Sequence, residues 1–230
     1  MARRFRAPRL PPPGERVQLA EAESHHLLHV TLLPRGEALV AFDGDGFECD
    51  ARLIDVLDGR AVIEATSPVR RTSPPRAGVL IAALTRKPAW EGMLRMATEL
   101  GVTELRPFVG RRSVARGEHL ERWARIVAGA AGQCGRGDVP DIRPVQPLER
   151  CLEGCDGLRR LALVPGAPLA DRVQGAGVAV LIGPEGGLDP AELALADEAG
   201  FSPAGLSAWT LRADTAAVAA LARLLPDPTP

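Results

Sequence analysis

The sequence has few aromatic residues, a single lysine and no long apolar run. Its 230 residues include three Trp, five Phe and no Tyr, so any core must consist mainly of Leu, Val, Ala and Ile. No apolar stretch approaches the roughly 20 residues of a membrane span, and the basic N-terminus lacks the apolar segment of a signal peptide. We therefore expect no membrane partner and a cytoplasmic location.

A regular pattern of cysteines or metal ligands is also missing. The chain has four cysteines: Cys49, Cys134, Cys151 and Cys155. Their spacing matches neither a disulfide scaffold nor a zinc site, so we expect free thiols in a reducing compartment. His25, His26 and His29 lie close together, and positions i and i+4 share a helix face. Two histidines without a third ligand are a weak metal signal, and we predict no metal site.

The net charge of −1 excludes a uniformly basic protein but conceals an uneven distribution. Residues 106–136 carry seven arginines and two acids, and residues 66–90 carry five basic residues and no acid. Residues 171–230 reverse the sign, with eight acids and three arginines. This asymmetry fits a basic face that contacts phosphates. Arginines scattered over a solvated surface explain the charges equally well, so charge alone leaves both interpretations open.

The first 65 or so residues are typical of a small β-rich domain. Alternating apolar residues predict strands over 37–42, 47–57 and 60–65, and residues 20–30 predict a short helix. Asp-Gly pairs at 43–46 and 58–59 provide the positive φ angles of tight turns. Short strands joined by such turns favour a small β-barrel. The polar, Pro-rich segment 67–76 is expected to be a linker that continues neither a sheet nor a helix.

The rest of the chain alternates between apolar strands and helices. We expect strands over 78–84, 102–109, 160–164, 178–182 and around Leu206, and helices over 89–100, 118–134, 190–199 and 214–225. Asp189 and Glu192 are placed to form a capping box at the start of the third helix, and Pro190 suits its first turn. This alternation predicts an α/β domain with a mainly parallel sheet covered on both faces.

The segment GPEGG at Gly183–Gly187 is the sharpest candidate for chemistry. It follows a buried strand and precedes a capped helix, and ligands of parallel sheets bind at the carboxyl ends of strands. Glycines there allow close approach of the backbone to a ligand. The segment matches neither a Walker A loop nor the GxGxxG fingerprint of dinucleotide sites, which argues against a nucleotide-dependent oxidoreductase. A tight turn that needs glycine for its geometry alone is an equally good interpretation of this segment by itself.

A second segment, LSAWTLRADTAA at residues 206–217, could be no more than a strand end followed by an Ala-rich helix. Taken together, the two segments resemble the RsmE family of the SPOUT superfamily, which methylates N3 of a uridine in small-subunit ribosomal RNA. Further matches in order and spacing are Arg3–Phe5, His25–Leu27, Phe42–Gly44, Lys87, Ala97–Val102, Arg111–Val114, Glu121–Trp123 and Gln133–Arg136. The resemblance therefore covers nearly the whole chain.

The resemblance implies a PUA-like RNA-binding β-barrel over 1–67, a linker over 68–77 and a SPOUT methyltransferase domain with a C-terminal trefoil knot over 78–230. It implies a homodimer that acts on small-subunit (16S) ribosomal RNA or on the assembled small subunit. S-adenosyl-L-methionine (SAM) would bind in loops after three strands. The matching cofactor residues are Val164, Pro165, Ile182, Gly183, Glu185, Gly186, Gly187, Leu206, Ser207 and Leu211.

Methylation of N3 requires loss of a proton, which a guanidinium beside O2 or O4 of uracil would favour. Arg212 is the first candidate for this catalytic role and Arg6 the second. Glu185 could orient SAM or accept the proton; a helix-start carboxylate that interacts with the dipole is the simpler alternative. Phosphates of RNA are expected to contact a further set of basic residues. This set comprises Arg3, Arg4, Arg6, Lys87, Arg111, Arg112 and Arg136.

The chain departs from the family pattern at several positions. Ser207 replaces a glycine and would crowd the SAM site, and Trp209 stands where arginine is common. Asp214 replaces a glutamate, and Gly132 replaces another. Ser207 and Gly132 are the best support for the alternative function, a non-catalytic RNA-binding or ribosome-assembly factor that keeps the fold.

The three tryptophans, Trp90, Trp123 and Trp209, could stack on bases. We expect Trp90 and Trp123 to be buried in the core instead.

Overall fold

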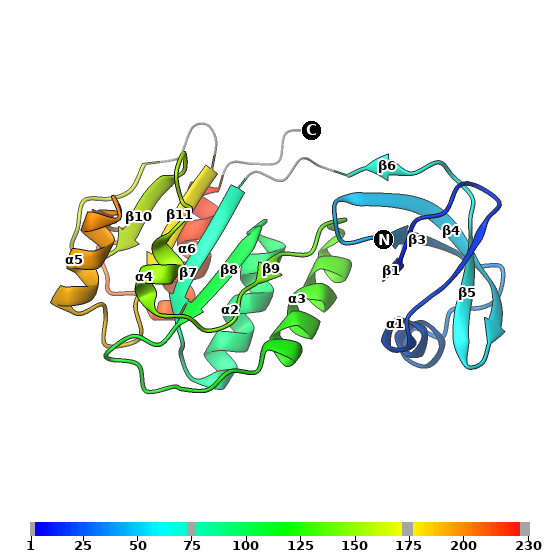
Figure 1. Cartoon of the computed structure of the whole chain (residues 1–230), viewed down its shortest axis with the longest axis horizontal. Coiled ribbons are helices and arrows are strands. Elements are labelled where there is room, and N and C mark those ends of the chain that lie inside the picture. Colours follow the sequence, from blue (N-terminus) through cyan, green and yellow to red (C-terminus); the bar gives the residue numbers. More distant parts are fainter. Residues whose placement is uncertain (1–2, 73–76, 172–176, 226–230) are drawn as a thin grey trace. The chain divides into compact units, whose positions relative to one another are not determined.

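A computed structural model of the protein describes residues 3–72, 77–171 and 177–225. The chain divides into two compact units (Figure 1). Of the described residues, the first unit comprises 3–72 and 131–139, and the second comprises 77–130, 140–171 and 177–225. Residues 131–139, which the sequence placed with the C-terminal domain, pack with the first unit because Val139 N donates to Gly44 O and Gly46 N donates to Gly137 O.

The first unit contains one mixed sheet and one short helical segment. The strand order is β1-β3-β4-β5-β2, and β6 also pairs with β4; β1 runs parallel to β3, and the other pairs are antiparallel. The elements are β1 (Arg4–Arg6), β2 (Arg16–Gln18), α1 (Glu21–His25), the π-helical turn η1 (His26–Val30), β3 (Ala38–Phe42), β4 (Phe47–Leu57), β5 (Arg60–Ala65) and β6 (Arg70–Arg71).

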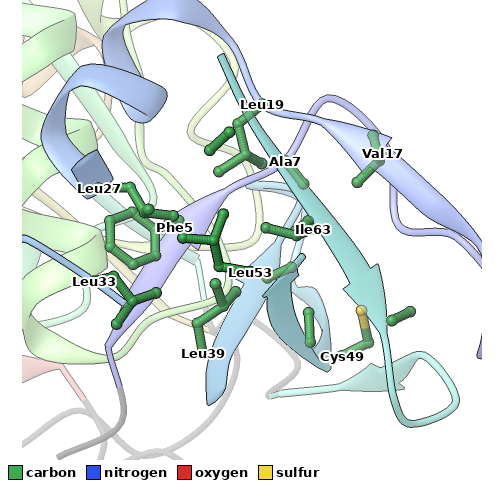
Figure 2. Close-up of a cluster of buried hydrophobic side chains, with 14 residues drawn as sticks. Phe5, Ala7, Val17, Leu19, Leu27, Leu33, Leu39, Cys49, Leu53 and Ile63 are labelled. Carbon is green, nitrogen blue, oxygen red and sulfur yellow. The ribbon is translucent and has the colours of Figure 1, made fainter. Parts of the chain in front are cut away.

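Apolar side chains from both ends of this sheet meet in one core (Figure 2). Phe5, Leu27, Leu53 and Ile63 are its fully buried centre. They come from β1, η1, β4 and β5, so the helical turn closes the core that the strands leave open. Burial of side chains of this size stabilises the fold by roughly 1.5–3 kcal/mol each.

The expected linker is wrong at Arg70–Arg71, which form β6. The physical cause is electrostatic, because Arg70 bonds Glu48 and Asp50 on the neighbouring β4 at 2.8 and 2.9 Å. Glu48 is buried and also pairs with Arg4. Propensity alone does not reveal such a strand, since arginine is not among the residues enriched in strands. Residues 73–76 of the predicted linker lie outside the described part of the chain.

The second unit is a parallel six-stranded sheet with helices on both faces, as expected (Figure 1). The strand order is β12-β10-β11-β7-β8-β9, and every neighbouring pair is parallel. The elements are β7 (Ala77–Ala83), α2 (Lys87–Glu99), β8 (Glu104–Phe108), α3 (Leu120–Cys134), β9 (Asp141–Ile142), α4 (Leu148–Leu152), β10 (Arg159–Leu163), β11 (Gly177–Ile182), α5 (Pro190–Glu198), β12 (Ser202–Ala204) and α6 (Ala213–Leu224).

The central strand β11 is buried along its whole length, which explains its unbroken apolar sequence. Val79 and Ile81 of β7 share a core with α4 and α5, whereas α6 packs on β11 and α2. The expected last strand around Leu206 is wrong: β12 covers Ser202–Ala204, and Leu206 follows it in a loop. Among the described residues, no helix combines the length and apolar character needed to cross a membrane.

Candidate cofactor cavity

The carboxyl ends of β12, β10 and β11 lie side by side, because these strands are consecutive in the sheet. A cavity of about 300 Å³ opens at this edge, within the size range of small-molecule sites. Its walls come from three segments that are distant in the sequence: 163–165 after β10, 182–187 after β11, and 204–216 around the start of α6. The fold therefore brings together the two segments that carried the family resemblance.

Nine of the ten predicted cofactor residues line this cavity. They are Val164, Pro165, Ile182, Gly183, Glu185, Gly187, Leu206, Ser207 and Leu211. The described lining does not include the tenth, Gly186, whose carbonyl oxygen accepts a hydrogen bond from Arg112 Nη1 at 2.9 Å. The prediction missed Leu163, Ala204, Ala213 and Ala216, which also line the cavity. Each is within a few residues of a predicted position, so the motifs located the wall but not its full extent.

The loop Gly183–Gly187, called here the glycine loop, is fixed by close backbone packing. A Cβ atom on Gly183 would lie 2.6 Å from Leu188 N and 2.9 Å from Gly187 C, closer than real Cβ contacts allow. Gly187 has φ +73°, a conformation that side chains rarely adopt. Gly187 N also donates to Pro184 O at 2.8 Å, which closes the turn. These two glycines are thus required by geometry, whatever the cavity binds.

The helix that follows the glycine loop begins with the predicted capping box. Asp189 accepts a hydrogen bond from Glu192 N, and Glu192 Oε2 accepts one from Asp189 N, both at 2.8 Å. Glu192 is only 4% exposed, and its second oxygen accepts from Arg111 N at 2.7 Å. The buried Glu192 carboxylate accepts two of these bonds, from Asp189 N and Arg111 N, and so ties the segment after β8 to the start of α5.

Arg111 and Arg112, predicted as RNA contacts, both have partners beside the glycine loop. Arg112 Nη1 donates to the carbonyl oxygens of Gly186 and Leu188, and Arg111 Nε lies 3.4 Å from Asp189 Oδ2. The side chain of Arg111 is nevertheless largely exposed. The sequence could not reveal these bonds, since they join residues more than 70 positions apart.

The segment Leu206–Arg212, called here the tryptophan loop, also lines the cavity. It belongs to no strand or helix, and its Trp209 N donates to Ser207 Oγ at 3.0 Å. Arg212 is the N-cap residue of α6 and lines the cavity with a 79% exposed side chain. Its Nε lies 3.5 Å from Asp214 Oδ1, a loose and exposed pair that contributes little stability. Glu185, on the glycine loop, is exposed at the same cavity.

The remaining predicted residues lie elsewhere. Arg6 belongs to the first unit, where its Nε donates to Asp43 O at 3.0 Å and its guanidinium lies against Gly44. Arg4 is paired with Glu48, and Arg136 with Asp138. Arg3 and Lys87 are exposed.

No histidine or cysteine is among the described residues that line the cavity. In the described part of the chain, no group of three or more His, Cys, Asp or Glu is arranged to hold a metal ion. All four cysteines are free. Burial raises the pKa of the Cys151 thiol to about 11, which keeps it protonated near neutral pH.

Comparisons with known proteins agree with this geometry. A family model described as the RNA methyltransferase domain matches residues 72–225. Ribosomal RNA small subunit methyltransferase E of Synechocystis sp. is 33% identical over 220 residues, which cover 90% of this chain and 72% of that protein. The enzyme of the same name from Bacillus subtilis is 26% identical and covers 88% of this chain and 86% of its own length.

Two solved structures share the fold over nearly their whole length. Ribosomal RNA small subunit methyltransferase E from Neisseria gonorrhoeae, bound to SAM, is 30% identical, with a TM-score of 0.87 over 96% of both chains. A putative methyltransferase from Legionella pneumophila, in complex with SAM, is 28% identical, with a TM-score of 0.88 over 96% of both chains. On this evidence the chain belongs to the RNA methyltransferase family and, within it, to the ribosomal RNA small subunit methyltransferase E (RsmE) family.

Proposed function

We propose that the protein transfers the methyl group of SAM to N3 of a specific uridine in 16S ribosomal RNA. The observation that carries the proposal is the convergence of nine predicted cofactor residues on one cavity at the carboxyl ends of three adjacent parallel strands. Relatives of the same fold have SAM bound, which supports the choice of cofactor.

The residues present fit such a cofactor. The cavity has apolar walls from Ile182, Leu206 and Leu211, suited to a flat base, and an exposed carboxylate at Glu185, suited to a cationic group. Backbone from the glycine loop approaches the cavity without intervening side chains at Gly183 and Gly187. When bound, SAM supplies an electrophilic methyl group on a sulfonium.

Arg212 is the residue we assign to catalysis. Uridine N3 is protonated at neutral pH, and it must lose this proton when it forms a bond to the methyl group. A guanidinium beside O2 or O4 stabilises the negative charge that develops on the ring as the proton departs. Arg212 lines the cavity, is exposed and is only loosely paired with Asp214, so its guanidinium is available to a substrate.

Two further residues complete the proposed chemistry. Glu185 is the proposed proton acceptor or orienting group, since its carboxylate is exposed at the cavity. Arg6 is the second candidate for charge stabilisation and belongs to the first unit. Its bond to the backbone of Asp43 fixes the side chain while leaving it exposed.

The finer architecture is part of the same proposal. We assign the mixed sheet of the first unit to a PUA-like barrel and the second unit to a SPOUT domain with a trefoil knot. We further propose a homodimer in the cytoplasm, for which the four free cysteines are suited. Among the proposed phosphate contacts, Arg3 and Lys87 are exposed and have no other role assigned to them here.

The decisive experiment incubates the protein and labelled SAM with small ribosomal subunits that lack uridine N3 methylation, and identifies the product by nucleoside mass spectrometry. Appearance of 3-methyluridine supports cofactor, substrate and reaction together. A SAM titration is run in parallel. Binding of SAM without 3-methyluridine overturns the substrate, and absence of both favours a non-catalytic RNA-binding or ribosome-assembly factor.

A further inference from the structure

Trp209 is placed unlike the other two tryptophans. Trp90 and Trp123 are each 3% exposed and contact each other, with ring centroids 5.4 Å apart, so they are core residues as expected. Trp209 is 81% exposed, more than any other large apolar residue in the described part of the chain. Leaving an indole in water forgoes the stabilisation that its burial would bring. Its exposure therefore calls for a partner outside the unit.

The position of Trp209 indicates what this partner contacts. Trp209 lines the cofactor cavity and yet is mostly exposed, so it lies at the rim and not in the wall. Arg212 shares the same loop and cavity, and its side chain is 79% exposed. The rim thus presents an aromatic side chain and a guanidinium together. Unpaired bases stack on aromatic side chains, and phosphates or base carbonyls accept hydrogen bonds from a guanidinium.

The backbone that carries Trp209 is held by Ser207. Ser207 Oγ accepts the Trp209 N–H at 3.0 Å, a local turn in which the hydroxyl replaces a backbone acceptor. A glycine at position 207 would lack this acceptor and would add conformational freedom. The two departures from the family pattern, Ser207 and Trp209, are therefore structurally coupled, because the serine hydroxyl stabilises the turn that carries the tryptophan.

We propose that Trp209 is a stacking residue for an unpaired base of the RNA substrate, and that Ser207 is its positioning residue. This inference rests on the proposed RNA methyltransferase function. The cofactor's adenine is the other base that this side chain could meet. The 81% exposure favours RNA, because a base held inside the cavity contacts only the part of the indole that lines the cavity, and the remaining exposed surface is available to a larger ligand.

The test measures two affinities for each variant. The affinity for unmethylated small ribosomal subunits is measured by competition binding, and the affinity for SAM by calorimetry; KM and kcat for methyl transfer follow. Trp209→Ala removes the stacking of one base, so we expect the Kd and KM for the subunit to rise about 5- to 150-fold. Trp209→Phe should recover most of this loss, since it keeps an aromatic face.

Two further readouts separate stacking from a charge or structural effect. The slope of log Kd against log salt should be the same for Trp209→Ala and wild type, because stacking neutralises no phosphate. Leu169→Ala is the matched control: Leu169 is exposed and apolar in the same unit but does not line the cavity, so its replacement should change neither affinity.

Ser207→Gly tests the positioning role. It should weaken subunit binding in the presence of Trp209, by less than Trp209→Ala does, and should have no further effect in the Ser207→Gly/Trp209→Ala double variant. Additive losses in the double variant would show that Ser207 acts independently, which overturns its part of the proposal.

Each remaining outcome has a definite meaning. Weakened SAM binding by Trp209→Ala would assign the side chain to the cofactor, and a change in oligomeric state would assign it to a second copy of the chain; either result overturns the inference. If Trp209→Ala binds the subunit as tightly as wild type and the wild type methylates it, the inference is overturned and the proposed function stands. If Trp209→Ala binds the subunit more weakly than wild type but the wild type does not methylate it, the proposed function is overturned and the inference stands.

Discussion

The two loops that line the cofactor cavity are held in very different ways. The glycine loop is packed against its own backbone, and Arg112 donates a hydrogen bond to its Gly186 carbonyl. The buried Glu192 accepts hydrogen bonds from Arg111 N and from Asp189 N, just after the loop. The tryptophan loop has a local hydrogen bond from Trp209 N to Ser207 Oγ and joins α6 through the bond from Ala216 N to Arg212 O, and it presents exposed side chains at Trp209 and Arg212. A preorganised wall suits a cofactor of constant shape, whereas a rim with fewer restraints suits a large substrate to which the loop adjusts on binding.

This comparison predicts a division of labour that substitutions can break. Changes in the tryptophan loop should affect RNA binding and turnover while SAM affinity persists. Changes that loosen the glycine loop should lower SAM affinity first.

The largest effect is expected from Arg212→Ala in the tryptophan loop. Loss of one group that stabilises developing negative charge typically lowers kcat by about 10²- to 10³-fold. SAM affinity should remain within about twofold of wild type, as measured by calorimetry. Arg223→Ala is the control, because Arg223 lies on the same helix α6 but bonds the carbonyl of Ala170 away from the cavity lining. Normal turnover by Arg212→Ala would remove this residue from the mechanism.

Gly183→Ala should be the most damaging change in the glycine loop. Its Cβ would meet backbone atoms at 2.6 and 2.9 Å, and these cannot move as a flexible side chain can. Overpacking of this kind costs about 1–3 kcal/mol, which corresponds to roughly 6- to 150-fold in SAM affinity if the loop takes up the strain. Gly129→Ala in helix α3 is the control, since no atom lies within 4 Å of its Cβ and alanine favours helix. Unchanged SAM binding by Gly183→Ala would mean that the loop shape is unimportant for the cofactor.

Glu192→Gln probes the buried link between the glycine loop and the segment after β8. Glutamine keeps one of the two oxygens that accept from Arg111 N and Asp189 N, so one buried donor loses its partner. We expect a loss of about 1–3 kcal/mol and a fall in Tm of several degrees, measured by calorimetric melting. The exposed Glu198→Gln, at the other end of the same helix, should melt within about one degree of wild type. Equal melting of the two variants would contradict a stabilising role for Glu192.

The sequence predicted those features of the site that local chemistry controls. The capping box of Asp189 and Glu192 and the glycine turn follow from short-range rules, and both are present in the structure. The strand β6 was missed because its stability comes from the ion pairs of Arg70 with Glu48 and Asp50. The bonds of Glu192 with Arg111 and of Arg112 with Gly186 could not be foreseen, since only the folded sheet brings these segments together.

Arg112→Ala should have the smallest effect of the series, and it decides between two roles for one side chain. Family resemblance predicts a phosphate contact, whereas the structure shows Nη1 bonded to Gly186 O at 2.9 Å beside the cavity. Loss of this charged hydrogen bond at an exposed position should weaken SAM binding by about 3- to 10-fold, equivalent to about 1 kcal/mol. The salt dependence of RNA binding should then match that of wild type, since a phosphate contact would contribute about one unit of slope. Arg111→Ala is the control, as its exposed guanidinium bonds only loosely to Asp189. Arg112→Ala could instead reduce the slope of log Kd against log salt by about one unit and leave SAM affinity intact. The Arg112 guanidinium would then leave the Gly186 carbonyl and contact RNA in the complex. In that case the glycine loop is held less firmly in the complex than in the free protein.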